Sequence, residues 1–215
     1  MATRKYEQKR RAELQGETRQ RIVEAMVALH RELGPARTTI SAIAERAGVE
    51  RLTVYRHFDG ESAMFEACSA HFAAEVPPPD PAVWQGVEDP AERLRAALLA
   101  FYDYYGRAEE MLAKVHRDVP LLPALAAVLA PWEAFVAAVR DGLVGGWRTR
   151  GAARARLVTA VSHALRFETW QSLRRADALR DADAADLMVT LAQAVAAAGP
   201  LRGPAQRRGG RTRSR

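Results

Sequence analysis

The sequence predicts an all-α fold of about nine helices, in which a three-helix N-terminal unit precedes a larger helical bundle. Ala, Leu, Arg and Glu dominate most stretches of the chain, and all four favour helices. Apolar residues recur at steps of three and four, while the alternating runs typical of strands are missing. Because 48% of its 215 residues are hydrophobic, the chain has enough apolar surface to bury a core.

The N-terminal end predicts an arm and a first helix. Residues 1–16 are charged and carry no apolar pattern, so we expect a disordered basic arm. Residues 17–33 bear a single apolar stripe, which predicts an amphipathic helix that Gly34-Pro35 ends.

The next stretch, Thr38 to Phe58, predicts two short helices joined by a tight turn. Thr38 or Thr39 caps the first of them, and Gly48 suits the left-handed conformation of the turn. With Val54 and Phe58 turned inward, the rest of the second helix is free to face outward. This is helix-turn-helix geometry, in which the second helix enters the DNA major groove.

The remaining stripes predict the helical bundle. A fourth helix begins after Asp59-Gly60 and ends by Pro77. After Pro90 we expect a helix with a stripe from Leu94 to Tyr105, then a short helix around Met111 to Val115 that ends near Pro120. A long helix with a stripe from Leu125 to Leu143 should be kinked at Pro131 and end at Gly145-Gly146, and further helices are expected at about 153–175 and 183–198. The 153–175 helix has two apolar sides, so it needs cover on both. Residues 200–215, rich in Arg and Gly, are expected to form a disordered tail.

The charge is unevenly distributed and supports this division. The net charge is +6, yet residues 1–60 hold 12 Lys and Arg against 8 Asp and Glu, and residues 61–199 hold 14 against 18. The tail adds six arginines and no acid. This pattern is typical of a polyanion-binding end attached to a body with another task.

Several classes of protein are excluded by what the sequence does not contain. One cysteine, Cys68, rules out a disulfide framework and a zinc site of clustered cysteines. No secretory signal or membrane-length apolar run is present, so we expect a cytoplasmic protein without a membrane partner. A P-loop and an HExxH motif are also missing, so we expect no enzyme activity, no metal and no cofactor.

Residues 18–72 resemble the DNA-binding domain of the TetR/AcrR family of transcriptional regulators. The resemblance rests on three motifs: Ile22-Val23-x-Ala25, Thr39-Ile40-x-x-Ile43-Ala44-x-x-Ala47-Gly48-Val49, and Thr53-Val54-Tyr55-x-x-Phe58. It implies a homodimer that reads a palindromic double-stranded DNA operator. It further implies a helix-turn-helix domain at residues 17–60 and a ligand-binding and dimerisation domain at residues 61–199.

The residue types of the second short helix suit DNA contact, since Arg can pair with guanine and hydroxyls can bond phosphates. The expected DNA-binding residues are Thr39, Arg51, Leu52, Thr53, Tyr55, Arg56 and His57. Two positions depart from the family pattern. Leu52 stands where a glycine is common, and Glu61 stands where a lysine usually contacts phosphate.

The bundle offers two groups of candidate residues. Aromatic and polar side chains suit a pocket for a small apolar or aromatic effector: Phe65, Phe72, Phe101, Tyr105, Met111, Trp132, Phe135, His163, Phe167 and Trp170. Within this group, His163 and Phe167 are the preferred patch because they lie one turn apart. Apolar stripes on the last two helices suit a dimer interface: Val158, Val161, Leu165, Leu187, Leu191, Ala194 and Val195.

The sequence therefore predicts a ligand-responsive repressor that an effector releases from its operator. The alternative is a helical module that binds small molecules or proteins and has lost specific DNA recognition, which Leu52 and Glu61 favour. The sequence does not distinguish a repressor from an activator.

Overall fold

The computed structural model describes residues 2–198, and for residues 2–5 the backbone alone. Within this range the chain is all-α, as predicted, and has no strand. Ten α-helices and two 3₁₀ turns follow one another: α1 (Ala2–Glu32), η1 (Pro35–Arg37), α2 (Ile40–Ala47), α3 (Arg51–His57), α4 (Gly60–Glu75), α5 (Ala82–Gln85), α6 (Pro90–Asp118), η2 (Val119–Leu121), α7 (Pro123–Gly145), α8 (Gly151–Ala164), α9 (Phe167–Arg175) and α10 (Asp181–Ala197). The tail predicted at 200–215 lies outside the described residues.

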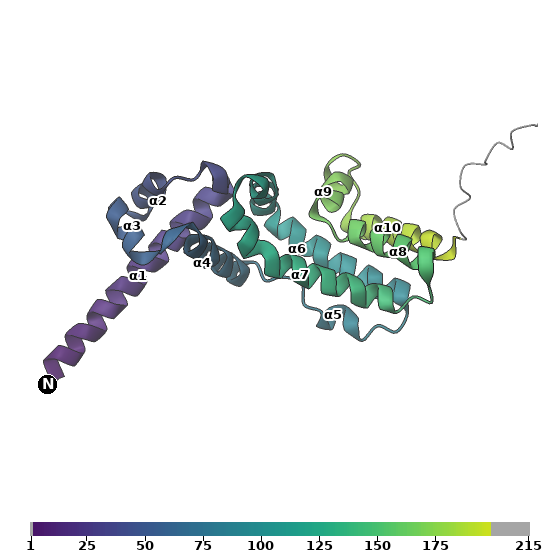
Figure 1. The fold of residues 1–215 in the computed structure, drawn as a ribbon, viewed down its shortest axis with the longest axis horizontal. Coiled ribbons are helices and arrows are strands. Elements are labelled where there is room, and N and C mark those ends of the chain that lie inside the picture. The colour runs from purple at the N-terminus through teal and green to yellow at the C-terminus, as the bar shows by residue number, and fades with distance from the viewer. Residues whose placement is uncertain (1, 199–215) are drawn as a thin grey trace, which may run out of the picture.

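The molecule is elongated, with the helix-turn-helix at one end and α8 and α10 at the other (Figure 1). Helix α4 lies between these two parts and packs against both α1 and α7. The first turns of α1 project beyond the rest of the fold.

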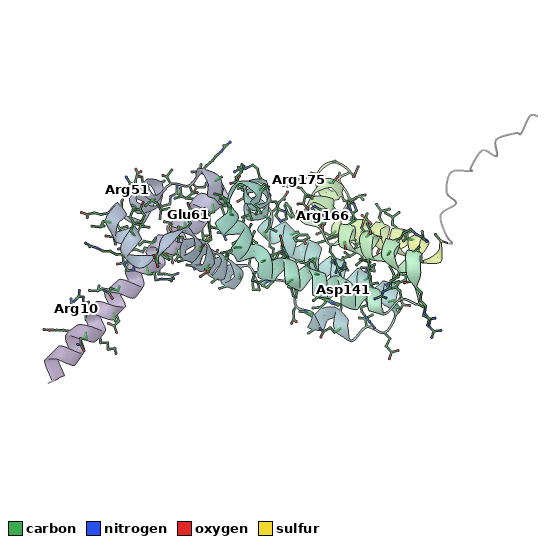
Figure 2. All side chains as sticks on the ribbon, in the orientation of Figure 1. Arg10, Arg51, Glu61, Asp141, Arg166 and Arg175 are labelled. Atoms are coloured by element: carbon green, nitrogen blue, oxygen red, sulfur yellow. The ribbon has the colours of Figure 1, made fainter. Side chains whose placement is uncertain are left out.

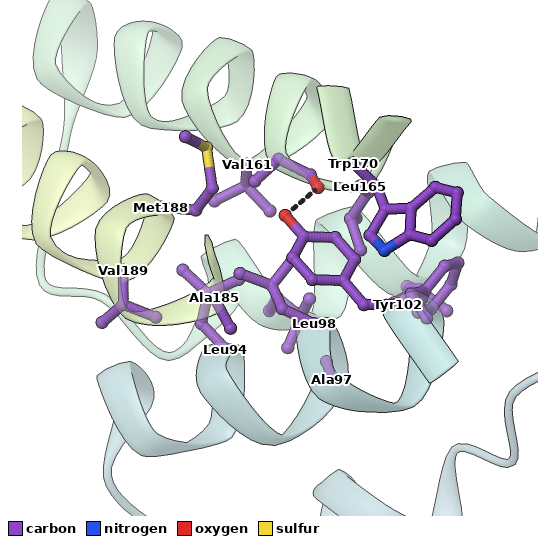
Figure 3. Close-up of a cluster of buried hydrophobic side chains, with 14 of the residues drawn as sticks. Leu94, Ala97, Leu98, Tyr102, Val161, Leu165, Trp170, Ala185, Met188 and Val189 are labelled. Atoms are coloured by element: carbon purple, nitrogen blue, oxygen red, sulfur yellow. Dashed lines mark hydrogen bonds between the residues drawn. The ribbon is translucent and has the colours of Figure 1, made fainter. Parts of the chain in front are cut away.

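Two apolar clusters hold these parts together. The N-terminal cluster joins α1 to α4 around Ile22, Met26, Ile43 and Val54, and extends into α6 and α7. The larger cluster lies between α6, α8 and α10 (Figure 3) and contains Tyr102 among apolar side chains of all three helices. Because the N-terminal cluster includes residues of α6 and α7, the DNA-reading end shares its core with the bundle.

Three helices differ from their predicted bounds. Helix α1 begins at Ala2, although no regular structure was expected for residues 1–16. The helix predicted from the stripe Leu94 to Tyr105 and the short helix predicted around Met111 to Val115 are one helix, α6, which continues through Gly106. There a Cβ would lie 3.8 Å from Trp170, an ordinary contact, so the position does not require a glycine. The short helix α5 was not predicted.

The helix predicted at 153–175 is broken into α8 and α9 at Leu165 and Arg166. The break turns Val161 and Leu165 into the chain's own core, where they are 0% and 1% exposed. Their assignment to a dimer interface was therefore wrong, since a residue buried within one chain has no surface left for a second copy.

A polar clasp ties the end of α6 to the segment before α2. The Arg117 guanidinium donates to the carbonyl of Leu33 at 2.9 Å and to the Asp118 carboxylate. That carboxylate also accepts from the backbone N–H of Ala36 at 3.0 Å. The pKa of Asp118 lies below its ordinary value, mainly because its carboxylate accepts a hydrogen bond from Arg117. Burial acts in the opposite direction and is outweighed.

Among the described helices, α7 alone is long and apolar enough to span a membrane by length and composition. One such helix is weak evidence for a span, and α7 packs against α4 and α8.

Candidate nucleic-acid interface and ligand cavity

The turn between α2 and α3 has the predicted geometry. Thr39 caps α2, since its hydroxyl oxygen accepts from the N–H of Ala42 at 3.1 Å. Gly48 ends the helix at φ 64°, a left-handed conformation that costs a glycine little. Because the oxygen of Thr39 serves as the cap, its hydroxyl proton remains a donor for a phosphate.

The predicted recognition helix, α3, turns four side chains outward. Val54 and Phe58 are buried as expected, which fixes the opposite face of the helix toward solvent. Arg51, Leu52, Tyr55 and Arg56 form this exposed arc, with Leu52 and Tyr55 more than half exposed. Thr53 and His57 are partly buried and lie on the side of α3 that faces α1.

The charges of the arc are free of internal partners. Neither Arg51 nor Arg56 forms an ion pair or a side-chain hydrogen bond within residues 2–198, whereas nearby Arg46 is paired with Glu32. Unpaired guanidinium groups on a helix at the end of the molecule can bond phosphates or guanine edges. Figure 2 shows Arg51 at this end and Glu61 at the start of α4. Glu61 is exposed and likewise has no partner among the described residues.

Two adjoining cavities lie between the helix-turn-helix and the far end of the bundle. The inner cavity, of about 200 Å³, lies between α1, α4, α6 and α7 and is lined mainly by apolar side chains. The outer cavity, of about 380 Å³, lies between α6, α7, α8 and α9. They share the lining residues Leu112, His116, Leu129 and Trp132, so they are neighbours, and we call the two cavities together the channel.

Six of the ten candidate pocket residues line this channel. Phe65, Phe72 and Met111 line the inner cavity, Tyr105 and Phe167 line the outer one, and Trp132 lines both. The other four do not. Phe101 and Trp170 are 0% and 2% exposed in the core, and Phe135 lines a separate groove beside Trp84.

His163 is the fourth residue outside the channel, and the preferred His163–Phe167 patch was wrong. The break at Leu165 places the two residues on different helices, with Phe167 in the outer cavity and His163 in an external groove beside Met188. A shared helix face required an unbroken helix.

The polar groups of the outer cavity form a small network. His116 Nδ1 lies 2.7 Å from the Glu168 carboxylate, which Arg166 also approaches at 3.4 Å. Burial by itself raises the pKa of Glu168. A backbone hydrogen bond, His116 and Arg166 outweigh that effect and leave the pKa below its ordinary value. Glu168 is therefore a carboxylate at neutral pH.

The inner cavity has a polar pair that sequence reasoning missed. His30 Nδ1 lies 3.2 Å from Cys68 Sγ, and both side chains are buried. Burial lowers the pKa of His30 to about 4 and raises the pKa of Cys68 to about 12, so both groups are neutral. His30 lies in the DNA-reading part of the sequence, and nothing in its local pattern indicates a cavity.

Comparison with known proteins gives the same architecture. Residues 22–68 match the model of the bacterial regulatory proteins of the tetR family. No curated protein sequence matches the chain. A TetR-like transcriptional regulator from Rhodococcus sp. RHA1 is 21% identical with a TM-score of 0.53, over 82% of this chain and 93% of that one.

Two further solved structures are similar. A second Rhodococcus sp. RHA1 transcriptional regulator is 20% identical with a TM-score of 0.57, over 85% of this chain and 99% of that one. A TetR transcription regulator from Haloarcula marismortui is 17% identical with a TM-score of 0.52, over 84% and 97%. These matches confirm the resemblance in the sequence: the helix-turn-helix domain matches the tetR family, and the fold of the chain is similar to that of tetR-family transcriptional regulators.

Proposed function

We propose that this protein is a dimeric repressor whose recognition helix α3 reads a palindromic operator and whose bundle binds a small apolar or aromatic effector. The exposed arc of α3 carries the proposal. Arg51 and Arg56 present charges without internal partners, and Tyr55 presents a hydroxyl and a ring at the end of the molecule. These groups suit base and phosphate contacts in a major groove.

A dimer through α8 and α10 supplies the second recognition helix. Leu187 and Leu191 are 40% and 48% exposed on α10, and Ala194 continues their stripe. Val158 and Val195 are half-buried beside it. Large apolar side chains aligned on one exposed helix face favour a protein contact, and a second copy covers the same stripe symmetrically.

The channel supports a route from effector to DNA. Phe65, Cys68 and Phe72 line the inner cavity from α4, and α4 also contacts α1 through the Arg31–Glu75 ion pair. An effector that fits only one position of α4 shifts that helix and with it the helix-turn-helix. The two recognition helices of the dimer then no longer match successive major grooves.

The DNA claim is tested by selecting bound fragments from genomic DNA, including the region upstream of the protein's own gene. The selected duplex should bind the wild type tightly, and the Tyr55→Ala, Arg56→Ala double variant should bind it at least tenfold more weakly. Arg175→Ala, which removes an exposed cation of α9, is the control and should bind as the wild type does. Unchanged binding by the double variant removes α3 from the proposed interface.

The effector claim is tested by a thermal-shift screen of small aromatic and apolar compounds. A compound that raises the melting temperature should also release the duplex. Phe167→Ala should leave DNA binding intact and weaken this release, whereas Val83→Ala, at an exposed site on α5, should not. If a compound binds but the protein prefers no duplex, the result favours the alternative, a helical module without specific DNA recognition. The exposed carboxylate of Glu61 is the observation that favours this alternative.

A further inference from the structure

The first turns of α1 form an exposed helix that no other part of residues 2–198 covers. Every side chain from residue 6 to residue 17 is exposed, and this part of α1 projects past the helix-turn-helix (Figure 1). An isolated helix of about 15 residues is only marginally stable in water. A contact outside the chain would stabilise it.

Acidic and basic side chains are segregated around this helix. At about 100° per residue, one line along the helix surface contains Gln8, Ala12, Gln15 and Arg19. Arg11 and Lys9 flank the line at about 70° and 90° on its two sides. Glu7 lies about 110° from the line, Glu13 about 130°, and Glu17 and Arg10 about 170°. One side of the helix is therefore basic, and we call it the basic face of α1.

The basic face is directed toward the recognition helix. A groove of about 490 Å³ is lined by Gln15, Gly16 and Arg19 of α1 and by Thr53, Arg56 and His57 of α3. No carboxylate lines it. Gly16 has no neighbouring atom within 4 Å of where a Cβ would be, so the groove is open at this point.

Two arginines connect the groove to its surroundings. Arg56 belongs both to the exposed arc of α3 and to the groove wall. Arg19 is positioned on the opposite wall by a cation–π contact, its guanidinium carbon 4.8 Å from the centroid of the Phe58 ring. Cations therefore lie on both walls of the groove, and Arg11 lies about two turns before Arg19 along α1.

The flanking lysine is also available to a ligand. Lys9 lies 3.9 Å from Glu13, but their side chains are 78% and 58% exposed. An exposed pair of this kind contributes little to stability, so a phosphate can replace the carboxylate.

We propose that the basic face of α1 binds the sugar–phosphate backbone of the duplex beside the major groove that α3 reads. The proposal rests on the proposed DNA-binding function and adds a second, sequence-independent contact to it. Its ligand is duplex phosphate, which the cations on both walls of the groove and the exposed cations Lys9 and Arg11 favour. The contact raises affinity for every duplex and gives no preference among sequences.

The test compares two adjacent arginines in the full chain. Arg11 lies on the basic face and Arg10 on the opposite side of the same helix turn, where Figure 2 shows it on the projecting segment. Replacing either with alanine removes the same charge and preserves helix propensity. Binding to a fluorescent mixed-sequence duplex is measured between about 50 and 200 mM salt.

Arg11→Ala should weaken binding about threefold and reduce the slope of log K against log salt by about 1, whereas Arg10→Ala should change neither. The Lys9→Ala, Arg11→Ala double variant should weaken binding about tenfold and reduce the slope by about 2. Circular dichroism of each variant checks that helix content is unchanged.

Equal effects of Arg10→Ala and Arg11→Ala, or no effect of the double variant, would overturn the proposal. The operator function is judged separately. It fails if no genomic duplex is preferred by the wild type, whereas the basic-face contact fails if the Lys9 and Arg11 variants bind mixed-sequence DNA as the wild type does.

Discussion

The hydroxyl of Tyr105 donates a 2.6 Å hydrogen bond to the backbone carbonyl of Leu165, at the point where α8 ends and α9 has not begun. One turn earlier along α6, the Tyr102 hydroxyl donates to the carbonyl of Ala164 at 3.0 Å. The break between α8 and α9 leaves these carbonyls without helical partners, and the two buried tyrosines replace them. Through this pair α6 fixes the position of Phe167 in the outer cavity.

Tyr105→Phe should lower the free energy of unfolding by about 1 to 3 kcal/mol, because it leaves the buried carbonyl of Leu165 without a donor. Urea denaturation followed by circular dichroism measures the change. Tyr55→Phe removes a hydroxyl from a half-exposed ring and should leave stability unchanged. A Tyr105→Phe protein as stable as the wild type would show that another donor reaches Leu165.

His30→Phe should reduce the loss of stability in acid. The pKa of His30 is lowered from 6.5 to about 4 by burial, against a smaller opposing effect of Asp118. Between these values the unfolded chain binds the proton and the folded chain does not, so stability falls as the pH falls through this window. The wild type should lose about 2 kcal/mol more than the variant between about pH 7 and 5.

Denaturation of both proteins at each pH measures this difference, in which the titration of all other groups cancels. His71→Phe is the control, since His71 is partly exposed and pairs with Glu75 on the surface. Parallel pH profiles for the wild type and His30→Phe would mean that His30 binds its proton equally well in the folded and the unfolded protein.

Gly34→Ala should destabilise the clasp between α6 and the helix-turn-helix. Gly34 has a φ of 93°, which L side chains rarely adopt, and a Cβ there would collide with the side chains of Arg117 and Asp118. We expect a loss of at least about 2 kcal/mol in unfolding free energy. Gly142→Ala, at an uncrowded helical position in α7, should be neutral or stabilising by up to about 1 kcal/mol.

The Leu187→Arg, Leu191→Arg double variant should be monomeric if α10 forms the proposed dimer interface. Two buried cations in a symmetric contact oppose each other and lose their hydration. Sedimentation at several concentrations measures the oligomeric state. Leu121→Arg changes a more exposed leucine in η2 and should leave the dimer intact. A dimeric double variant would place the interface elsewhere.

The helix-turn-helix was predictable because its signals are local. Thr39, Gly48 and the spacing of Val54 and Phe58 each act within a few residues of their own helix. The break at Leu165 was not predictable, since no Gly or Pro marks it and its carbonyls are satisfied by tyrosines about 60 residues away in the sequence. This one missed break accounts for the errors at Val161, Leu165 and His163.

The ligand cavity was predicted only in part, for a related reason. An aromatic stripe looks the same whether it fills a core or lines a cavity, and only tertiary packing separates Phe101 and Trp170 in the core from Trp132 in the channel.

The basic face of α1 could be predicted from the sequence in its composition but not in its orientation. Its charge pattern is visible in the sequence, but it acquires a direction only once residues 6–17 are helical and Arg19 lies beside α3.

Glu61→Lys should strengthen DNA binding. Glu61 is exposed in the first turn of α4 and has no partner within residues 2–198, and the family resemblance implies a phosphate-contacting lysine at this position. A carboxylate close to a phosphate repels it, whereas an ammonium group attracts it and releases a counterion. We expect binding to the selected operator to tighten several-fold and the salt slope to grow by about 1 in magnitude.

Glu66→Lys makes the same charge change at an exposed site further along α4 and should have a smaller effect, because it lies farther from the helix terminus next to α3. Equal tightening by both variants would mean that net charge alone acts, and that α4 does not approach the backbone.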